Sequence, residues 1–300
     1  MSKSKRKLLF IINPNSGTSR KNRIPDLIDK LIDKSANDYE IVFTTKPKEA
    51  TAISKARKGD FDTIIAVGGD GTINEVARPL INSDTALGII PMGSGNGLAR
   101  HLGIPLNVKR AIKLLNKAHV SSIDTIKLND LAFLNVAGVG FDAHIANAFA
   151  QVKKRGFITY AKLTLGELRR FKYTGCKLRI DGVEQIENTP FIVSVANSTQ
   201  YGNNAKIAPQ AHITDGLMDI CVLQKIPFWY YPMLAVRLFS GTLSKSKYYS
   251  CRQGKEAFIS FQKGNKPQPI HLDGDPFVIE NEIKLTINPL SLKVALPDSF

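Results

Sequence analysis

Two glycine-rich segments carry residue types that bind phosphate groups. They are GGDGTINE at 68–75 and PMGSGNG at 91–97. Each follows a short apolar run typical of a buried strand, 63–67 and 87–90, and each precedes a helix-like stretch. Glycines let a backbone approach a ligand and adopt positive φ, so that successive N–H groups converge on an anion. A strand, a glycine turn and a helix N-terminus together predict a phosphate-binding loop, and hence nucleotide chemistry.

One carboxylate, Asp70, lies inside the first segment. An acid among phosphate-binding groups is suited to holding a phosphate-bound Mg²⁺, because that ion prefers oxygen ligands. An aspartate flanked by glycines can instead form an Asx-turn. We favour the Mg²⁺ role for Asp70.

The charge and cysteine content narrow the class of protein. Forty-one Lys and Arg against 26 Asp and Glu give 41 − 26 = +15, which favours polyanionic partners. Three cysteines without a CxxC pair argue against a disulfide framework and a zinc site, and fit a reducing cytosol. No apolar stretch approaches the roughly 20 residues that span a bilayer. We expect a cytoplasmic protein that meets the inner face of a membrane only from its surface.

The order of elements predicts two domains. Over 7–115, strand signals at 7–12, 40–44, 63–67 and 87–90 alternate with helix signals at 24–32, 49–57 and 73–80. Alternation with short links favours a parallel α/β sheet. From about Ser122 strand-like runs follow one another, at 122–127, 132–137, 177–180, 190–196, 217–223, 257–261 and 269–273. This pattern predicts an antiparallel, largely β second domain, with one helix-like insert at 156–173.

The ordered motifs resemble the diacylglycerol kinase catalytic family, which includes sphingosine and ceramide kinases and bacterial lipid kinases. Besides the two glycine-rich segments, the match covers NPNSG at 13–17, Thr44 ahead of Glu49, GVGFD at 138–142, KIAP at 206–209 with DGLMD at 215–219, and DGD at 273–275. NAD kinases and phosphofructokinases share a similar GGDGT. The complete ordered set is far more specific than that single motif.

The resemblance implies ATP-dependent phosphorylation of a lipid hydroxyl, on diacylglycerol or a sphingoid base. It also implies a nucleotide-binding α/β lobe of the NAD kinase and phosphofructokinase type, 1–123 completed by 282–300, and a β-sandwich lipid-substrate lobe, 124–281. Two motifs depart from the commoner bacterial pattern. GSGNG replaces GT-x-ND and looks like the sphingosine kinase branch, and DGD replaces DGE. The identity of the lipid therefore stays open.

The resemblance also implies roles for particular residues. The residues it places at the ATP site are Asn13, Pro14, Asn15, Ser16, Gly17, Thr44, Gly69, Asp70, Gly71, Thr72, Ile73, Asn74, Glu75 and Ser94. Asp275, in the position of the DGE acid, is the expected base, since a carboxylate raised toward neutral pH by burial can accept a hydroxyl proton. Turn chemistry alone would also select the sequence DGDP.

A second Mg²⁺ site is implied at His212, Asp215 and Leu217. In bacterial relatives the outer two positions contribute backbone carbonyls, and oxygen ligands of this kind suit Mg²⁺. The alternative for these residues is a plain hairpin turn around Asp215 and Gly216.

Two stretches have the composition of a membrane-docking element. Residues 153–173 combine a basic run with apolar residues at helical spacing, and 227–234 hold the only tryptophan, followed by Arg237, Lys245 and Lys247. Each stretch could instead be a helix packed on the β lobe. The net charge favours an anionic membrane surface as the partner of the chain, with a homodimer left open.

Two other functions compete with lipid phosphorylation. A soluble-substrate kinase of the NAD kinase type shares GGDGT but has no need of a basic amphipathic stretch. A polyanion-binding protein without catalysis fits the charge, yet the basic and aromatic motifs of RNA-binding modules are missing from the sequence. We therefore expect no nucleic-acid partner.

Overall fold

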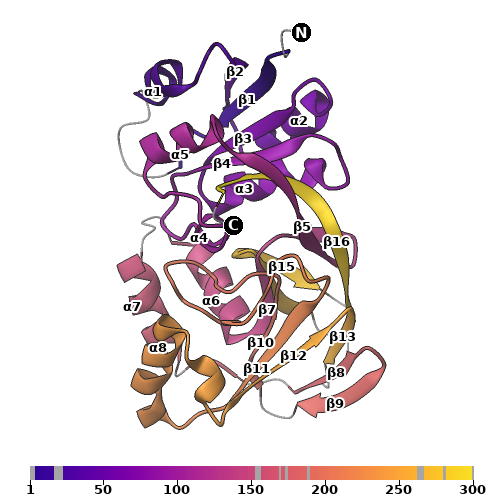
Figure 1. Ribbon diagram of the computed structural model, residues 1–300. Coiled ribbons are helices and arrows are strands. Elements are labelled where there is room, and N and C mark those ends of the chain that lie inside the picture. The colour runs from indigo at the N-terminus through magenta and orange to yellow at the C-terminus, as the bar shows by residue number, and fades with distance from the viewer. Residues whose placement is uncertain are drawn as a thin grey trace. The chain divides into compact units, whose positions relative to one another are not determined.

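The computed structural model describes residues 4–16, 23–152, 157–168, 170–172, 175–187, 190–261, 267–279 and 282–298. The chain divides into two compact units, Met1–Ile123 with Leu290–Phe300, and Asp124–Pro289 (Figure 1). The second unit includes 282–289, which the sequence interpretation assigned to the first domain.

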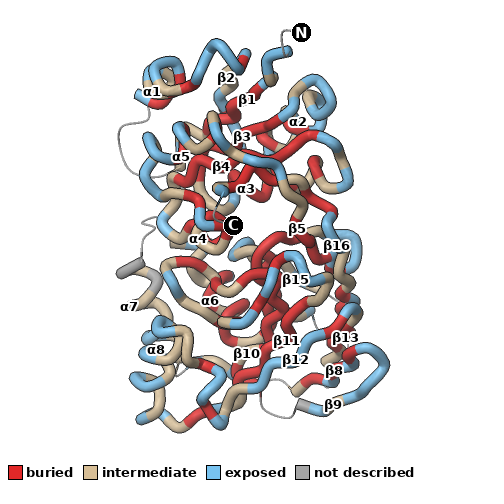
Figure 2. The backbone as a smooth tube through the Cα atoms, viewed as in Figure 1, coloured by how far each residue is buried: buried red, intermediate tan, exposed pale blue. Residues whose placement is uncertain are grey.

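The first unit is the predicted parallel α/β lobe. Its strand order is β2-β1-β3-β4, and Val294 of β16 pairs in parallel with Leu87 of β4. The strands are β1 (Arg6–Ile12), β2 (Asn37–Phe43), β3 (Thr63–Gly68), β4 (Ala86–Pro91) and the last part of β16 (Ile283–Leu296). β3 and β4 are buried along their whole length (Figure 2), as expected for parallel strands covered on both faces.

The helices of this unit are α1 (Ile24–Leu31), α2 (Glu49–Arg57), α3 (Asp70–Ala77), η2 (Arg78–Leu80), α4 (Gly97–His101) and α5 (Val108–Leu115). The helix expected at 73–80 begins three residues earlier, at Asp70, because the glycine-rich segment forms the first helical turn. It tightens into η2 at Pro79, which cannot donate an N–H to a continuing helix. The side chain of Asn116 joins two helix ends, since its Nδ2 donates to Leu31 O at 2.8 Å and its Oδ1 accepts from Asp33 N–H at 3.1 Å.

The second unit is the predicted antiparallel β-sandwich. One sheet has the order β12-β11-β10-β7-β14-β15, and the other pairs β16, β13, β8 and β9, with β5 beside β16 and β6 beside β5. The strands are β5 (His119–Leu128), β6 (Leu131–Phe133), β7 (Val136–Gly140), β8 (Cys176–Ile180), β9 (Val183–Glu187), β10 (Pro190–Ala196), β11 (Met218–Gln224), β12 (Tyr249–Gly254), β13 (Glu256–Phe261), β14 (Gln268–Leu272) and β15 (Asp275–Ile279). Its helices are α6 (Phe141–Ala150), α7 (Phe157–Glu167), η3 (Phe228–Tyr230), α8 (Tyr231–Ser240) and η4 (Leu243–Lys245).

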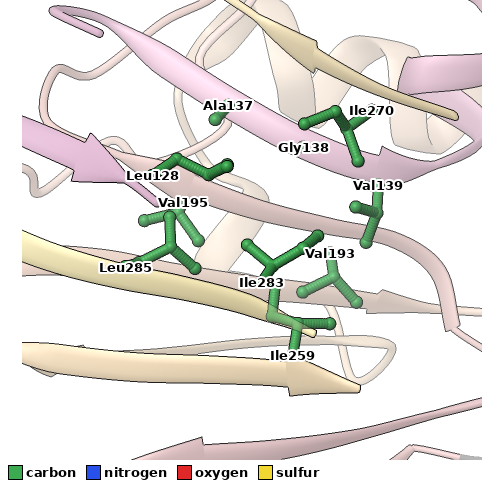
Figure 3. A pocket seen from close by; sticks show the side chains of 10 residues that line it. All are labelled: Leu128, Ala137, Gly138, Val139, Val193, Val195, Ile259, Ile270, Ile283 and Leu285. Atoms are coloured by element: carbon green, nitrogen blue, oxygen red, sulfur yellow. The ribbon is translucent and has the colours of Figure 1, made fainter. Parts of the chain in front are cut away.

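Apolar side chains fill the space between the two sheets. Val193 and Val195 of one sheet face Ile259 and Leu285 of the other around a cavity of about 10 Å³ (Figure 3). A cavity of this size is near the lower limit for one water molecule, which would need polar partners that these side chains lack. The sandwich interior is therefore a packed core and not a lipid-binding space.

One predicted strand is divided in two. The run expected at 132–137 forms the end of β6 and the start of β7, with a break at Leu134 and Asn135. The backbone N–H groups of Leu134, Asn135 and Val136 donate to the carboxylate of Asp273 at 2.8 to 3.0 Å. Because these N–H groups donate to one side chain, they cannot also form the hydrogen bonds of a regular β-ladder.

Candidate active site

The two glycine-rich segments contact each other in the first unit. They follow β3 and β4, which are adjacent parallel strands and therefore end at the same edge of the sheet. A Cβ added to Gly93 would lie 2.7 Å from the Cα of Gly69, and one added to Gly69 would lie 3.2 Å from the Cα of Gly93. The close crossing of two backbones is what requires glycine at these positions.

The expected positive φ angles are not found at these glycines. Gly69, Gly71, Gly93 and Gly95 all lie outside the left-handed region, and the left-handed residue of this loop is Asn96, with φ 50°. The Asn96 side chain stabilises the turn: its Oδ1 accepts from Gly93 N–H at 2.9 Å and its Nδ2 donates to Gly93 O at 2.8 Å. Free N–H groups therefore come from a helix N-terminus, not from a run of left-handed glycines.

That helix is α3. It begins at Asp70 with Gly69 at the N-cap, and no side chain caps it. The first N–H groups of an α-helix have no intrahelical acceptor, so an uncapped N-terminus is suited to binding an anion.

The NPNSG segment reaches the same helix. The Thr72 hydroxyl of α3 accepts from Asn13 Nδ2 at 3.0 Å and lies 3.2 Å from Ser16 Oγ. Asn13 Oδ1 in turn accepts from Asn15 N–H at 2.8 Å, which shapes the turn around Pro14. Gly17 lies outside the described residues.

The other predicted nucleotide-site residues also follow strand ends. Thr44 comes directly after β2, is buried, and donates its N–H to Ile12 O at 2.9 Å. Ser94 follows β4 and is exposed, whereas Ile73 is buried in α3. Glu75 Oε1 accepts from Lys48 N–H at 3.2 Å, beside the start of α2. In parallel sheets the carboxyl edge of the strands is where ligands bind, and the predicted set lies along this edge.

The Asp70 carboxylate makes a contact that neither the predicted Mg²⁺ role nor the Asx-turn alternative includes. Its Oδ2 accepts from Asn96 N–H and its Oδ1 from Gly97 N–H, both at 2.8 Å. Asp70 thus caps α4 from the neighbouring segment. Burial raises the pKa of Asp70, and the N–H donors and the nearby Arg100 oppose that rise. Arg100, which sequence reasoning missed, also donates from Nε to Gly95 O at 3.0 Å.

The Mg²⁺ role of Asp70 stays a prediction, and its chemistry fits. Each carboxylate oxygen can accept more than one interaction, so the contacts with Asn96 and Gly97 leave acceptor capacity. A cation would stabilise a carboxylate whose charged form is disfavoured by burial.

Three side chains have buried donor atoms without acceptors among the described residues. They are Asn74, at Nδ2, Arg78, at Nε and Nη2, and, in α8 of the second unit, Arg237, at Nε. Asn74 belongs to the predicted nucleotide site. Arg78 was not predicted as a site residue. The only signal for it in the sequence is its position one helical turn after Asn74. Buried donors cost free energy unless an acceptor is supplied, which fits an oxygen-rich ligand.

In the second unit, Asp275 begins β15 directly after a tight turn. Asp273 and Gly274 both have positive φ, 53° and 89°, the conformation of a two-residue type I′ hairpin turn. The three backbone N–H groups that donate to the Asp273 carboxylate hold this turn in place. The expected burial of the base is not found, since Asp275 is exposed. The alternative of a plain turn is right for Asp273 and Gly274, and it leaves Asp275 displayed at the end of the turn.

The residues of the second predicted Mg²⁺ site form a local turn. Leu217 N–H donates to Asp215 Oδ1 at 3.0 Å, Gly216 has φ 71°, and both His212 and Asp215 are exposed. Over the described ranges no three His, Cys, Asp or Glu side chains gather as a metal site. The proposed site would use one carboxylate and two backbone carbonyls, so it stays a prediction.

The two predicted docking stretches differ in exposure. Of the first, α7 is described, while 153–156, Arg169 and Tyr173 lie outside the described residues. Leu168 and Phe171 pack on a cluster around Phe141 and Phe191, as the packed-helix alternative expects. In the second stretch, Phe228 is 78% and Trp229 69% exposed. No helix in the described part of the chain is long and apolar enough to cross a membrane.

Known proteins share both units. Residues 7–128 match the diacylglycerol kinase catalytic domain, and residues 135–296 match the YegS C-terminal NAD kinase beta sandwich-like domain. A Yersinia enterocolitica protein named "Probable lipid kinase YegS-like" is 31% identical over 245 residues, which is 79% of each chain. One of the same name from Citrobacter koseri is 28% identical over 296 residues, covering 96% of this chain and 95% of its own.

Solved structures show the same fold. A Bacillus anthracis structure described as a diacylglycerol kinase has a TM-score of 0.74 at 22% identity, and a second from that organism has 0.80 at 24%, each covering 98% of both chains. The fold therefore assigns this chain to the class of proteins in which a parallel α/β unit, here with glycine-rich strand ends, is followed by an antiparallel β-sandwich. The chain belongs to the diacylglycerol kinase catalytic family, in its YegS-like branch.

We expect Gly93→Ala to lower the free energy of unfolding by about 1–3 kcal/mol, because its methyl group would overlap the Gly69 backbone and the Asn96 side chain. Gly71→Ala is the matched control, since a Cβ there meets no atom within 4 Å. Chemical denaturation of both variants measures the difference. A Gly93→Ala protein as stable as wild type would show that the crossing relaxes freely.

Proposed function

We propose that this chain transfers the γ-phosphate of ATP to the hydroxyl of a membrane lipid. The observation that carries the proposal is the contact between the two glycine-rich segments beside the uncapped N-terminus of α3. Membership in the diacylglycerol kinase catalytic family and relatives named as lipid kinases support it.

The nucleotide phosphates are assigned to the first unit. The first N–H groups of α3 supply donors, and Asn13, Ser16 and Thr72 hold the adjacent loop in place. The buried donors of Asn74 and Arg78 are suited to phosphate oxygens. Asp70 would hold Mg²⁺, which when bound offsets the charge of the phosphate groups.

The acceptor chemistry is assigned to Asp275. Its carboxylate accepts the proton of the lipid hydroxyl as the hydroxyl oxygen forms a bond to the γ-phosphorus. The bond from that phosphorus to the β–γ bridging oxygen breaks, and ADP leaves with the electron pair. A fixed type I′ turn suits this role, because general-base catalysis needs a carboxylate held at hydrogen-bond distance from its substrate.

The exposed face of η3 and α8 is assigned to membrane docking. Exposed apolar residues recur at helical spacing on one face: Phe228, Trp229, Met233, Val236 and Phe239. The opposite face, with Leu234 and Leu238, packs on the sandwich. A helix that shows apolar side chains to water, Trp included, is typical of an element lying in the bilayer interface.

Charge makes an anionic bilayer the partner that fits this face. Lys245 and Lys247 are exposed shortly after α8, and the whole chain carries +15. Each basic residue near an anionic bilayer contributes about 1 kcal/mol. The proposal places the protein in the cytoplasm, peripheral to the inner membrane face.

We expect replacing Phe228 and Trp229 together by serine to weaken binding to vesicles of equal parts phosphatidylglycerol and phosphatidylcholine at least tenfold, since burying a large apolar side chain contributes about 1.5–3 kcal/mol. Vesicle sedimentation measures it. Val183→Ser with Ile186→Ser is the control, because these β9 residues are each 60% exposed away from this face. Equal losses in both double variants would contradict the assignment.

We expect label from γ-³²P-ATP to enter a lipid when diacylglycerol, monoacylglycerol, sphingosine and ceramide are offered in mixed micelles with Mg²⁺. NAD is included as a parallel acceptor, because the matched C-terminal domain is described as NAD kinase beta sandwich-like. Labelled NADP without labelled lipid would overturn the lipid proposal in favour of the soluble-substrate kinase.

We expect Asp275→Asn to lower turnover about 10²–10⁴-fold, the range for loss of a general base. Asp130→Asn is the control, since that side chain is also exposed and follows a strand of the same unit. Circular dichroism checks folding in both. Wild-type turnover in Asp275→Asn would remove Asp275 as the base.

A further inference from the structure

A buried carboxylate that the proposed function does not use lies in the GVGFD motif. Asp142, in the first turn of α6, is 8% exposed. Its Oδ1 accepts from Ala143 N–H at 2.8 Å. Its Oδ2 is within hydrogen-bond distance of three side-chain donors: Ser194 Oγ and Tyr201 OH at 2.9 Å and His271 Nε2 at 3.2 Å. A buried carboxylate with this many partners is held in one orientation.

Strand register explains how Asp142 reaches its partners. Gly138 of β7 pairs with Ser194 of β10 on one side and with His271 of β14 on the other. A Cβ on Gly138 would overlap Asp142 Oδ2 and lie 3.0 Å from His271 Nε2. Glycine at 138 therefore leaves the space in which the carboxylate meets the serine and the histidine.

His271 connects this cluster to the turn that bears Asp275. Its side chain is 3% exposed, and Nε2 is the donor to Asp142, because a carboxylate can only accept. Gly274 N–H donates to Nδ1 at 3.4 Å. Gly274 is the residue before Asp275, so the ring joins a fixed carboxylate on one side to the turn on the other.

We propose that Asp142 and His271 are positioning residues for Asp275. Asp273 anchors one side of the β14–β15 turn to the backbone of 134–136, and the Asp142–His271 pair anchors its other side to α6. Together they fix the direction in which the Asp275 carboxylate points. The inference rests on the proposed function, because it takes Asp275 to be the base.

Two His271 variants test the connection between Asp142 and the turn, one variant for each of its two hydrogen bonds. His271→Gln keeps an amide donor near the position of Nε2 and loses the acceptor for Gly274. His271→Asn keeps an acceptor near the position of Nδ1 and loses the donor to Asp142. We expect each to lower kcat about 10²-fold, the effect of misplacing a catalytic group by about 1 Å. KM for ATP stays at its wild-type value, since the nucleotide site is assigned to the other unit.

Tyr201→Phe is the matched control. It removes a donor from the same carboxylate oxygen but does not touch the turn. We expect a loss of thermal stability similar to that of the His271 variants, with kcat unchanged. A purely structural role of the cluster would instead lower kcat in all three variants in proportion to their loss of stability. If a His271 variant does not fold, Asp142→Asn, which keeps the shape of the side chain, takes its place.

Asp275→Asn is measured in the same series. Loss of turnover there, together with wild-type kcat in folded His271 variants, overturns the positioning role and leaves the base assignment intact. Full turnover in Asp275→Asn overturns the base assignment, and the positioning role with it. Loss of kcat in Asp275→Asn and in both His271 variants, with Tyr201→Phe unaffected, is the result that supports the inference.

Discussion

The close crossing of the backbones at Gly69 and Gly93 is the constraint on which the candidate nucleotide site depends. Two adjacent parallel strands deliver their loops to one edge, and only residues without Cβ atoms let those loops touch. The crossing brings the Asp70 carboxylate to the first N–H groups of α4. Because Asp70 satisfies those donors, the N-terminus of α3 is left as the uncapped one of the pair, and a phosphate binds best at an uncapped helix.

Both units use an aspartate in a glycine-rich turn as an acceptor for backbone N–H groups. Asp70 does this between two loops of the first unit, and Asp273 does it between a hairpin turn and the start of β7. In the DGD motif the two acids therefore differ: the Asp273 carboxylate accepts three backbone N–H groups, whereas Asp275 is exposed. This difference supports Asp275 over Asp273 as the proposed base, since a carboxylate saturated with N–H donors is a poor base.

Local pattern predicted the elements well and the long-range contacts poorly. Apolar runs such as 63–67 correctly predicted buried parallel strands. The ordered motifs correctly predicted the family, with its α/β lobe and its β-sandwich lobe. The break between β6 and β7 was missed because its cause, Asp273, lies 138 residues from Asn135. The Asp142–His271 contact spans 129 residues and has no local signature. Periodicity also could not decide which face of α8 is exposed, because both faces carry apolar residues.

The strand β16 has a consequence for how the chain is made. Leu292, Val294 and Leu296 are fully buried, and Val294 pairs with Leu87 of β4. The sheet that begins with β1 is thus completed by a strand that follows the whole of the second unit in the sequence. During synthesis the free edge of β4 stays open until some 170 residues of the other unit have emerged, a span of about 8–34 s at usual elongation rates. An unpaired strand edge can pair with other chains, so the edge of β4 is open to such pairing throughout that interval.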